Sequence, residues 1–447
     1  MSKMKNYHFG SIIEGKELEK GERPEVEIRN PYNAEVIGKV FYATPQDVEN
    51  AVTSAHRIYL KTMRKMPTHK RAEILRKTAD LLESEKDQFA HLLTVESGKP
   101  IKASRLEVAY AAQVLRFASQ ATKSIYEEPM SLNHVVGKRH LGIVKRVSLG
   151  VIAISLPINY PFTLLLYKMA PAIAAGNTIV LNPTATAAYS TGLLYRLFEK
   201  AGMPRGAINI VTGPQQSLIE NLRNHPKVKR LICTKSSAAT WKEKDNNVKN
   251  KILLDFKTKN PTIVFDKADL DFAITTIVTE GLLYTDRSIM SAQHVFVQKG
   301  VYEKFIEALM KKVQTLKVGD PLDDTVDIGP MATLTAAEKA ETWVKKMVER
   351  GVTVLIGGSR NHTMMEPTII SGVKADKSVG HVISHAPIIS IMPFYKKEEV
   401  MAYMNDAGAV LHSGVFTRNN KGATRKEEVN LAIEEMTAVK LIGHNLL

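Results

Sequence analysis

The residue best suited to nucleophilic chemistry in this chain is its single cysteine, Cys233. A thiolate is a strong nucleophile only where its surroundings lower the pKa of the thiol. Cys233 ends the apolar run Leu231-Ile232-Cys233, and a buried cysteine behaves as a small hydrophobic residue. The sequence therefore allows two interpretations, a relocated nucleophile or a packing residue, and the apolar run favours packing. A single cysteine also excludes an internal disulfide, so a cytoplasmic protein is expected.

The charge of the chain is strongly positive, with 61 lysines and arginines against 46 acidic residues and a net charge of +15. Such a charge could attract nucleic acid or another anionic partner. The lysines are scattered, with local clusters at 227–230 and 241–251, and no basic stripe is interleaved with aromatic residues. This pattern favours a solvated basic surface over a dedicated nucleic-acid site. No apolar run has membrane length and residues 1–10 are polar, so neither a membrane span nor a signal peptide is predicted.

The elements that would position any site alternate between strands and helices. Residues 45–125 show helical spacing of apolar residues, and Thr44-Pro45-Gln46-Asp47 predicts a capped start with an acidic first turn. Short apolar runs then predict buried strands at 151–155, 178–181, 207–211, 230–234, 252–254, 262–265, 295–297 and 352–356. Helices are predicted between them, at 164–174, 190–199, 301–316 and 336–350. This alternation predicts an α/β fold with parallel sheets, whose ligands bind beyond the carboxyl ends of the strands.

Several strings along the chain resemble those of the aldehyde dehydrogenase superfamily, in the same order. They are Glu96-Ser97-Gly98-Lys99-Pro100, Pro157-Ile158-Asn159-Tyr160-Pro161, the run from Ala170 to Thr178, Lys259-Asn260-Pro261, the run from Asp266 to Asp271, Val318-Gly319-Asp320-Pro321, Asp327-Ile328-Gly329-Pro330, Glu366-Pro367-Thr368 and Val415-Phe416-Thr417-Arg418. The resemblance covers residues 28–420. Near the end of the chain, Glu434-Glu435-Met436-Thr437 is similar to the lactaldehyde and non-phosphorylating glyceraldehyde-phosphate dehydrogenase branch of this superfamily.

The resemblance implies a division of the chain. Residues 1–127 and 149–253 would form a Rossmann-like domain of the dinucleotide-binding type, and 254–428 a catalytic-type α/β domain. Residues 128–148 read as a protruding hairpin and the tail as an exposed strand, so 128–148 with 429–447 would form an oligomerisation element, because an exposed strand edge needs a partner. A homo-oligomer, or a hetero-oligomer with another protein, is expected.

The catalytic residues that the resemblance implies are largely replaced. The family oxidises aldehydes through a cysteine thiolate, passes hydride to NAD(P), and uses a glutamate to activate water. Aligned through the strand at 295–297, the cysteine position holds Ile289, and His294 takes the place of an arginine. Isoleucine has no lone pair, and the adjacent Ser288 would need a neighbouring base that no motif supplies. The glutamate position holds Asp255, whose carboxylate is one methylene shorter; it could retain the role of base or simply form an ion pair with Lys257.

Two further positions of the family motifs bear on the same chemistry. Asn159 keeps the amide that would donate to an oxyanion, although local hydrogen bonding in its turn is the simpler role. A glycine pair that follows the glutamate in the family is replaced by Lys257 and Thr258, which fill space intended for substrate or nicotinamide. Asn159 and Asp255 are thus the only catalytic-type side chains that the resemblance leaves in place.

The cofactor-binding strings are eroded in the same way. The family's Lys-Pro-Ser-Glu reads Asn182-Pro183-Thr184-Ala185, its glycine pair keeps only Gly213, and its Phe-Thr-Gly-Ser turn reads Cys233-Thr234-Lys235-Ser236. The string at 386–390 lacks the carboxylate of a late Glu-x-Phe-Gly-Pro motif. Pro183, Gly213, Lys235 and Ser236 remain as weak candidate contacts, with Lys235 able to contact an anion and Ser236 able to cap a helix. Each lost charged contact costs on the order of 1–3 kcal/mol, so no cofactor is expected at high affinity, with NAD or NADP as the alternative, and no metal site is predicted.

Three functions follow from these observations. The favoured one is an aldehyde dehydrogenase-like protein that has lost catalysis and acts as a structural, regulatory or assembly protein. The second is an NAD(P)-dependent oxidoreductase with an altered site, and the third is an anion- or nucleic-acid-binding protein on the same scaffold.

Overall fold

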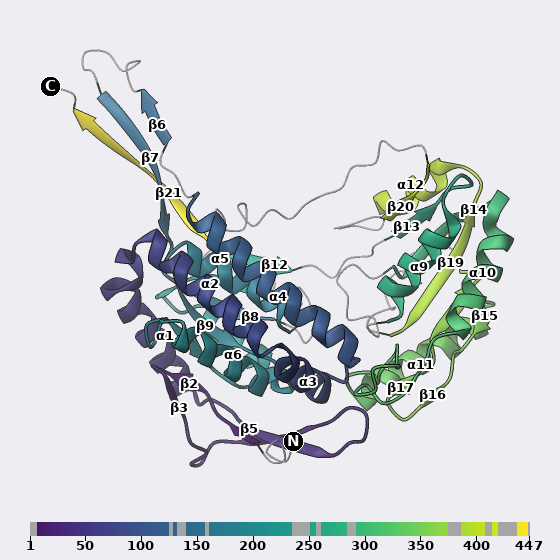
Figure 1. Cartoon of the computed structure of the whole chain (residues 1–447), viewed down its shortest axis with the longest axis horizontal. Coiled ribbons are helices and arrows are strands. Elements are labelled where there is room, and N and C mark those ends of the chain that lie inside the picture. Colours follow the sequence, from purple (N-terminus) through teal and green to yellow (C-terminus); the bar gives the residue numbers. More distant parts are fainter. Residues whose placement is uncertain are drawn as a thin grey trace.

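The computed structural model describes residues 7–124, 128–131, 140–156, 161–234, 251–255, 261–283, 292–373, 386–406, 414–418 and 436–445. These residues form two α/β bodies and a slender sheet that projects from the first body (Figure 1). Among them, no helix combines the length and the apolar character needed to cross a bilayer.

The first body is built on a seven-stranded sheet in the order β12-β11-β8-β9-β10-β2-β3. Its strands are β2 (Ile12–Ile13), β3 (Lys16–Glu17), β8 (Val151–Ser155), β9 (Thr178–Asn182), β10 (Ile208–Ile210), β11 (Val228–Thr234) and β12 (Lys251–Asp255). The five strands from β12 to β10 run parallel, whereas β2 and β3 extend the sheet antiparallel. All the strands predicted between 151 and 254 are therefore confirmed, as is their parallel arrangement.

Helices cover both faces of this sheet because alternate residues of each strand point to opposite sides. Val151 and Ala153 pack with α1 and α7, whereas Ile152 and Ile154 pack with the other helices. The helices are α1 (Pro45–Lys61), α2 (Thr68–Ser84), α3 (Lys86–Ser97), α4 (Ile101–Thr122), α5 (Thr163–Ala174), α6 (Ala188–Lys200) and α7 (Gln215–Arg223). The strands are buried on both faces, which is why they read as continuous apolar runs.

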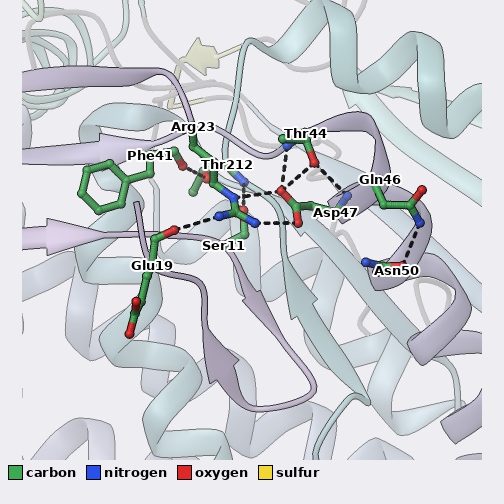
Figure 2. Close-up of polar contacts among 9 residues, drawn as sticks. All are labelled: Ser11, Glu19, Arg23, Phe41, Thr44, Gln46, Asp47, Asn50 and Thr212. Atoms are coloured by element: carbon green, nitrogen blue, oxygen red, sulfur yellow. Dashed lines mark hydrogen bonds and ion pairs between the residues drawn. The ribbon is translucent and has the colours of Figure 1, made fainter. Parts of the chain in front are cut away.

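The start of α1 shows how the N-terminal segments are fixed to this sheet (Figure 2). Thr44 and Asp47 form the predicted cap as a reciprocal capping box, and Arg23 donates to both carboxylate oxygens of Asp47 at 3.0 Å. Beyond β10, the hydroxyl of Thr212 donates to the carbonyl oxygen of Phe41 and lies 3.0 Å from the hydroxyl of Ser11. These bonds join the sheet to the smaller sheet β1-β5-β4 (Tyr7–Phe9, Val36–Phe41 and Glu25–Arg29).

The second body has a six-stranded sheet in the order β15-β18-β19-β14-β13-β20, parallel except for β15. Its strands are β13 (Pro261–Val264), β14 (His294–Gln298), β15 (Thr353–Ile356), β18 (Thr368–Ser371), β19 (Ile388–Phe394) and β20 (Gly414–Phe416). The helices α9 (Leu270–Gly281) and α10 (Tyr302–Gln314) cover one face, and α11 (Leu334–Glu349) and α12 (Lys397–Asp406) cover the other. A short two-stranded sheet, β16 (Arg360–Asn361) and β17 (Met364–Met365), lies beside it.

The projecting sheet has the order β21-β7-β6 and is antiparallel throughout. It combines β6 (Glu128–Ser131) and β7 (His140–Ser148) with β21 (Thr437–Asn445). The hairpin and the tail strand, predicted separately, thus pair with each other, and β6 and β21 are the outer strands of this sheet.

Strand β12 runs across one predicted domain boundary. The division at 253/254 falls inside β12, because Leu254 and Asp255 still pair with Cys233 and Thr234 of the first sheet. The physical reason is that the ladder with β11 continues to the end of both strands. The first sheet therefore ends at Asp255.

Candidate functional site

The only thiol of the chain lies inside the first body. Cys233 sits in β11 between Ser155 of β8 and Leu254 of β12, and none of its surface is exposed. It belongs to the core cluster under α1 and α7. Burial raises the pKa of the thiol to about 12, so the sulfur is protonated at neutral pH and is a poor nucleophile. The interpretation of Cys233 as a packing residue is confirmed.

The carboxyl edge of the first sheet brings several predicted positions together. Pro183 directly follows β9, Gly213 follows β10, and the backbone of Asp255 ends β12. Asn159, Lys235, Ser236 and Ile289 lie outside the described residues, as do Ser288, Lys257, Thr258 and the side chain of Asp255. Their catalytic and binding roles therefore stay predictions.

Polar side chains connect the strand ends at this edge. The Ser155 hydroxyl donates to Oδ1 of Asn182 at 2.9 Å, across the β8–β9 pair. Nδ2 of Asn182 donates to the carbonyl oxygens of Val211 at 3.0 Å and Gly213 at 3.4 Å. Nε2 of Gln215, at the start of α7, donates to the carbonyl oxygen of Ser155 at 3.2 Å. We call the side chains of Ser155, Asn182 and Gln215, with these bonds, the strand-end network.

The roles of Ser155 and Gln215 in this network were not predicted from the sequence. The role of Ser155 could have been inferred from the sequence, because two neighbouring buried strands each end in a polar residue. The β8–β9 register places Ser155 opposite Asn182. Gln215 gave no such signal, because a glutamine at the start of a helix is usually solvated.

A hollow of about 300 Å³ of empty space lies beside Asn182, lined mainly by apolar residues; its walls are Leu156, Pro161, Leu164, Leu165, Leu181, Asn182, Pro183, Thr184, Ala187 and Thr191. The buried hydroxyl of Thr184 has no partner in the described part of the chain. Ala185, which follows it, carries no polar side chain. Within the described residues, no group of three or more metal-ligating side chains is found.

The string Glu96–Pro100 proves to be an anchor between elements. The buried Glu96 accepts hydrogen bonds from the hydroxyl of Tyr7 at 3.1 Å and from the backbone of Tyr189 and Ser190 at 3.3 and 3.2 Å. Its carboxylate thus binds the N-terminal turn of α6. Burial raises the pKa of Glu96 to about 7, even though these donors act in the opposite direction.

Lys99 continues this anchor with a buried ion pair. Its ammonium contacts Glu107 of α4, and both side chains are at most 2% exposed. The other oxygen of Glu107 accepts from the backbone N–H of Phe162 at 2.9 Å and of Thr163 at 3.3 Å, at the start of α5. A carboxylate is favourable at a helix N-terminus. The pair therefore fixes the start of the helix that follows the Asn159 segment.

Three of the recognised strings meet where the two bodies touch. Gly98 ends α3 with a φ of 73°, and a Cβ at Gly329 would lie 2.3 Å from the carbonyl oxygen of Gly98. The N–H of Ile101 donates to the carbonyl oxygen of Pro321 at 2.8 Å, and Lys102 forms an ion pair with Asp327. Only glycine fits at 329. The strings at 96–100, 318–321 and 327–330 thus form the joint between the bodies.

His294, at the position of the family's arginine, is also structural. It begins β14, is 2% exposed, and its Nδ1 lies 2.9 Å from the hydroxyl of Ser390 on β19. That hydroxyl lies 3.0 Å from the carbonyl oxygen of Gln293 and donates to it. The Ser390 proton is therefore directed to the backbone, and the pair links two strands without presenting a nucleophile.

Comparison with known proteins places this fold and site. The model described as "Aldehyde dehydrogenase family" matches residues 18–431, and the chain belongs to that family. It is 31% identical over 421 residues to the 3-sulfolactaldehyde dehydrogenase of Priestia aryabhattai, covering 93% of this chain and 88% of that protein. It is 30% identical over 412 residues to the lactaldehyde dehydrogenase of Methanocaldococcus jannaschii, covering 91% and 87%.

The solved structures agree with the fold. A crystal structure described as an Escherichia coli NADP-dependent enzyme superimposes with a TM-score of 0.88 at 26% identity, covering 98% of each chain. An aldehyde dehydrogenase from Brucella melitensis biovar abortus superimposes with a TM-score of 0.87 at 27% identity, covering 97% of each. The predicted α/β fold and the resemblance to this family, including its lactaldehyde dehydrogenases, are both confirmed.

Proposed function

We propose that this chain is a non-catalytic member of the aldehyde dehydrogenase family that acts as a structural or regulatory subunit of an assembly. The observation that carries the proposal is the single cysteine, Cys233, which is fully buried in β11 with a raised pKa. The thiohemiacetal route of the family needs an accessible thiolate. The alignment adds Ile289 at the nucleophile position, and isoleucine offers no lone pair.

Assembly is the second part of the proposal. The outer strands β6 and β21 of the projecting sheet carry backbone groups that can pair with another chain. A homo-oligomer, or a hetero-oligomer with an active relative, would use this edge, and a reducing cytoplasmic compartment suits the buried thiol. Sedimentation of the purified chain at micromolar concentration tests this part: a mass above that of one 49.6-kDa chain is expected, and a monomer would refute self-assembly.

Catalysis is tested by mixing the chain with NAD or NADP and a small anionic or hydroxylated aldehyde. The absorbance of the NADH or NADPH that forms is then measured. We expect no turnover with 3-sulfolactaldehyde, lactaldehyde or succinate semialdehyde, with a relative of known activity assayed in parallel. Sustained NAD(P)-dependent oxidation would overturn the proposal. If turnover appears, the variant Cys233→Ala identifies the nucleophile: lost activity assigns it to Cys233, and retained activity excludes sulfur altogether.

A second candidate is NAD(P)-dependent oxidation at an altered site. It is favoured by the relatives, which include the Escherichia coli NADP-dependent succinate-semialdehyde dehydrogenase, 31% identical over 414 residues and covering 92% of this chain and 85% of that protein. In this reading Asp255 and Asn159 would keep their roles, and Lys235 would contact a phosphate. The relatives named here act on small aldehydes that carry an acid or hydroxyl group, so this class would be the substrate.

A third candidate is an anionic partner, favoured by the net charge of +15 and by one basic region. His56 of α1 lies near Lys227 and Lys229, and its pKa is lowered first by burial and then by these lysines. Titration of a fluorescent oligonucleotide at several salt concentrations tests it: affinity that falls steeply with salt supports a polyanion site, and a flat slope excludes it.

A further inference from the structure

The carboxyl ends of parallel strands are where α/β sheets bind their ligands, since backbone groups and loop side chains converge there. A dinucleotide held at this edge needs side chains with unused hydrogen-bonding capacity that face its ribose hydroxyl groups. Within the described residues, the ends of β8, β9 and β10 are where such side chains can be sought.

Asn182 has little such capacity left. Its side-chain amide offers two N–H groups and one carbonyl oxygen. The N–H groups serve the carbonyl oxygens of Val211 and Gly213, and the oxygen accepts the Ser155 hydroxyl. The residue is 2% exposed, so its amide faces the chain rather than the solvent.

The positions next to Asn182 offer few free hydrogen-bonding groups at the carboxyl edge of the sheet. The amide of Gln215 is directed to the carbonyl oxygen of Ser155 at 3.2 Å, and Ala185 has no polar side chain. The Thr184 hydroxyl is the single polar group of the hollow without a partner in the described part of the chain. The mainly apolar walls of this hollow also offer few polar partners to a dinucleotide.

From this we infer that the described part of the carboxyl edge, at the ends of β8, β9 and β10, is a structural joint and not a dinucleotide site. The strand-end network ties β8, β9, β10 and the start of α7 together with the groups that a cofactor would need. A dinucleotide would have to break these bonds, each at a loss of roughly two- to tenfold in affinity. This inference is independent of the missing nucleophile, because a chain without a catalytic thiol could still bind NAD.

Titration calorimetry of the full chain with NAD and, separately, with NADP tests the inference directly. At millimolar cofactor we expect no saturable heat and no rise in Tm. Saturable binding of either dinucleotide would overturn the inference. If binding occurs without aldehyde oxidation, the proposed function stands and only this inference fails.

The same network predicts which substitutions weaken the fold locally. Asn182→Ala removes a donor from the buried carbonyl of Val211 and from the half-buried carbonyl of Gly213, so we expect Tm to fall by several degrees and amide exchange to accelerate across residues 211–216. Ser155→Ala is the milder variant, in case Asn182→Ala fails to fold, and should accelerate exchange in the same segment to a smaller extent.

Asn209→Ala is the matched control. This buried asparagine of β10 accepts from the N–H of Glu14 at 3.0 Å and donates to the carbonyl oxygen of Gly206 at 2.8 Å, away from the strand ends. Its loss should also lower Tm, but faster exchange should be confined to the segments around residues 14 and 206. If Ser155→Ala and Asn182→Ala leave Tm and exchange at 211–216 unchanged, the strand-end network is not a structural joint and the inference is refuted.

Discussion

Strand β9 has an asparagine at each end: Asn177 directly precedes it and Asn182 is its last residue. The resemblance to the family gives these two asparagines different roles. At the amino end, Asn177 belongs to a string shared with the family; it accepts from the N–H of Gly150 at 2.9 Å and donates to the carbonyl oxygens of Ala172 and Met436 at 3.2 and 2.9 Å. At the carboxyl end, Asn182 stands where the family has a cofactor lysine, and it too bonds to the chain. Both asparagines thus bond to the chain, although the resemblance assigns only the second position to the cofactor.

The strings that resemble those of the family divide in the same way, into structural and chemical positions. Those that survive, around Glu96, Gly329 and Asn177, hold helices, bodies and strands together. Those that changed, around Ile289, Asp255 and Asn182, are the ones that the resemblance assigns to chemistry. The contacts of Glu96, Gly329 and Asn177 explain the first group by stability, because the loss of such an anchor would destabilise the fold.

The largest effect that would sharpen this comparison comes from the buried ion pair. Lys99→Ala leaves the Glu107 carboxylate uncompensated between α3, α4 and α5, and removing one partner of such a pair costs about 3–5 kcal/mol. We expect the free energy of unfolding, measured by urea denaturation, to fall by about 4 kcal/mol. The double variant Lys99→Met with Glu107→Leu should be more stable than Lys99→Ala; if Lys99→Ala costs less than ~1 kcal/mol, the anchor role is wrong.

Glu96 predicts a pH dependence whose sign follows from its burial. Its pKa in the folded chain is raised to about 7 from an ordinary 4.5, so the folded state prefers the protonated carboxyl. The resulting stability is fully present below pH 4.5 and is lost as the pH rises through 7. At 1.36 kcal/mol per unit this amounts to about 3 kcal/mol.

Glu96→Gln provides the control for that prediction, since glutamine does not titrate. The difference in unfolding free energy between the native chain and this variant should shrink, or reverse, by about 3 kcal/mol between pH 4.5 and pH 8. Other titrating groups cancel in this difference. A difference that stays constant over this range would show that Glu96 does not titrate there.

Asn177 tests the amino end of β9 against the carboxyl end. Asn177→Ala leaves the buried N–H of Gly150 and the carbonyl oxygen of Met436 without this partner, at a cost of about 2 kcal/mol, whereas the Ala172 carbonyl keeps the backbone N–H of residue 177. Because the Met436 carbonyl is one of these groups, we expect faster amide exchange at the start of β21 as well as at Gly150. Exchange that accelerates at the carboxyl edge instead would contradict the separation of the two ends.

The fold could be predicted from the sequence further than the site could. Runs such as Val151–Ser155 are buried on both faces of a parallel sheet, so their apolar character identifies them without knowledge of the partner strands. The joint of Gly98 with Gly329 depends on contacts between residues far apart in the chain, which no local pattern reveals. The strand-end network likewise depends on strand register. In the sequence, Asn182 is only a replacement of the lysine that the resemblance implies, and its structural role is visible only from its hydrogen bonds with Ser155 and Val211.

The smallest expected effect concerns the joint between the two bodies. Arg105 of α4 forms exposed ion pairs with Asp324 of the second body and Asp87 of α3. Because exposed pairs are screened and contribute less than ~1 kcal/mol, Asp324→Asn should lower the unfolding free energy only slightly and only at low salt. The close packing of Gly98 on Gly329 is steric and insensitive to salt, so Gly329→Ala should be clearly more destabilising at any ionic strength. If Asp324→Asn proves the more disruptive of the two, charge rather than the contact of Gly98 with Gly329 holds the bodies together, and the strings at 96–100 and 327–330 would lose their structural explanation at this joint.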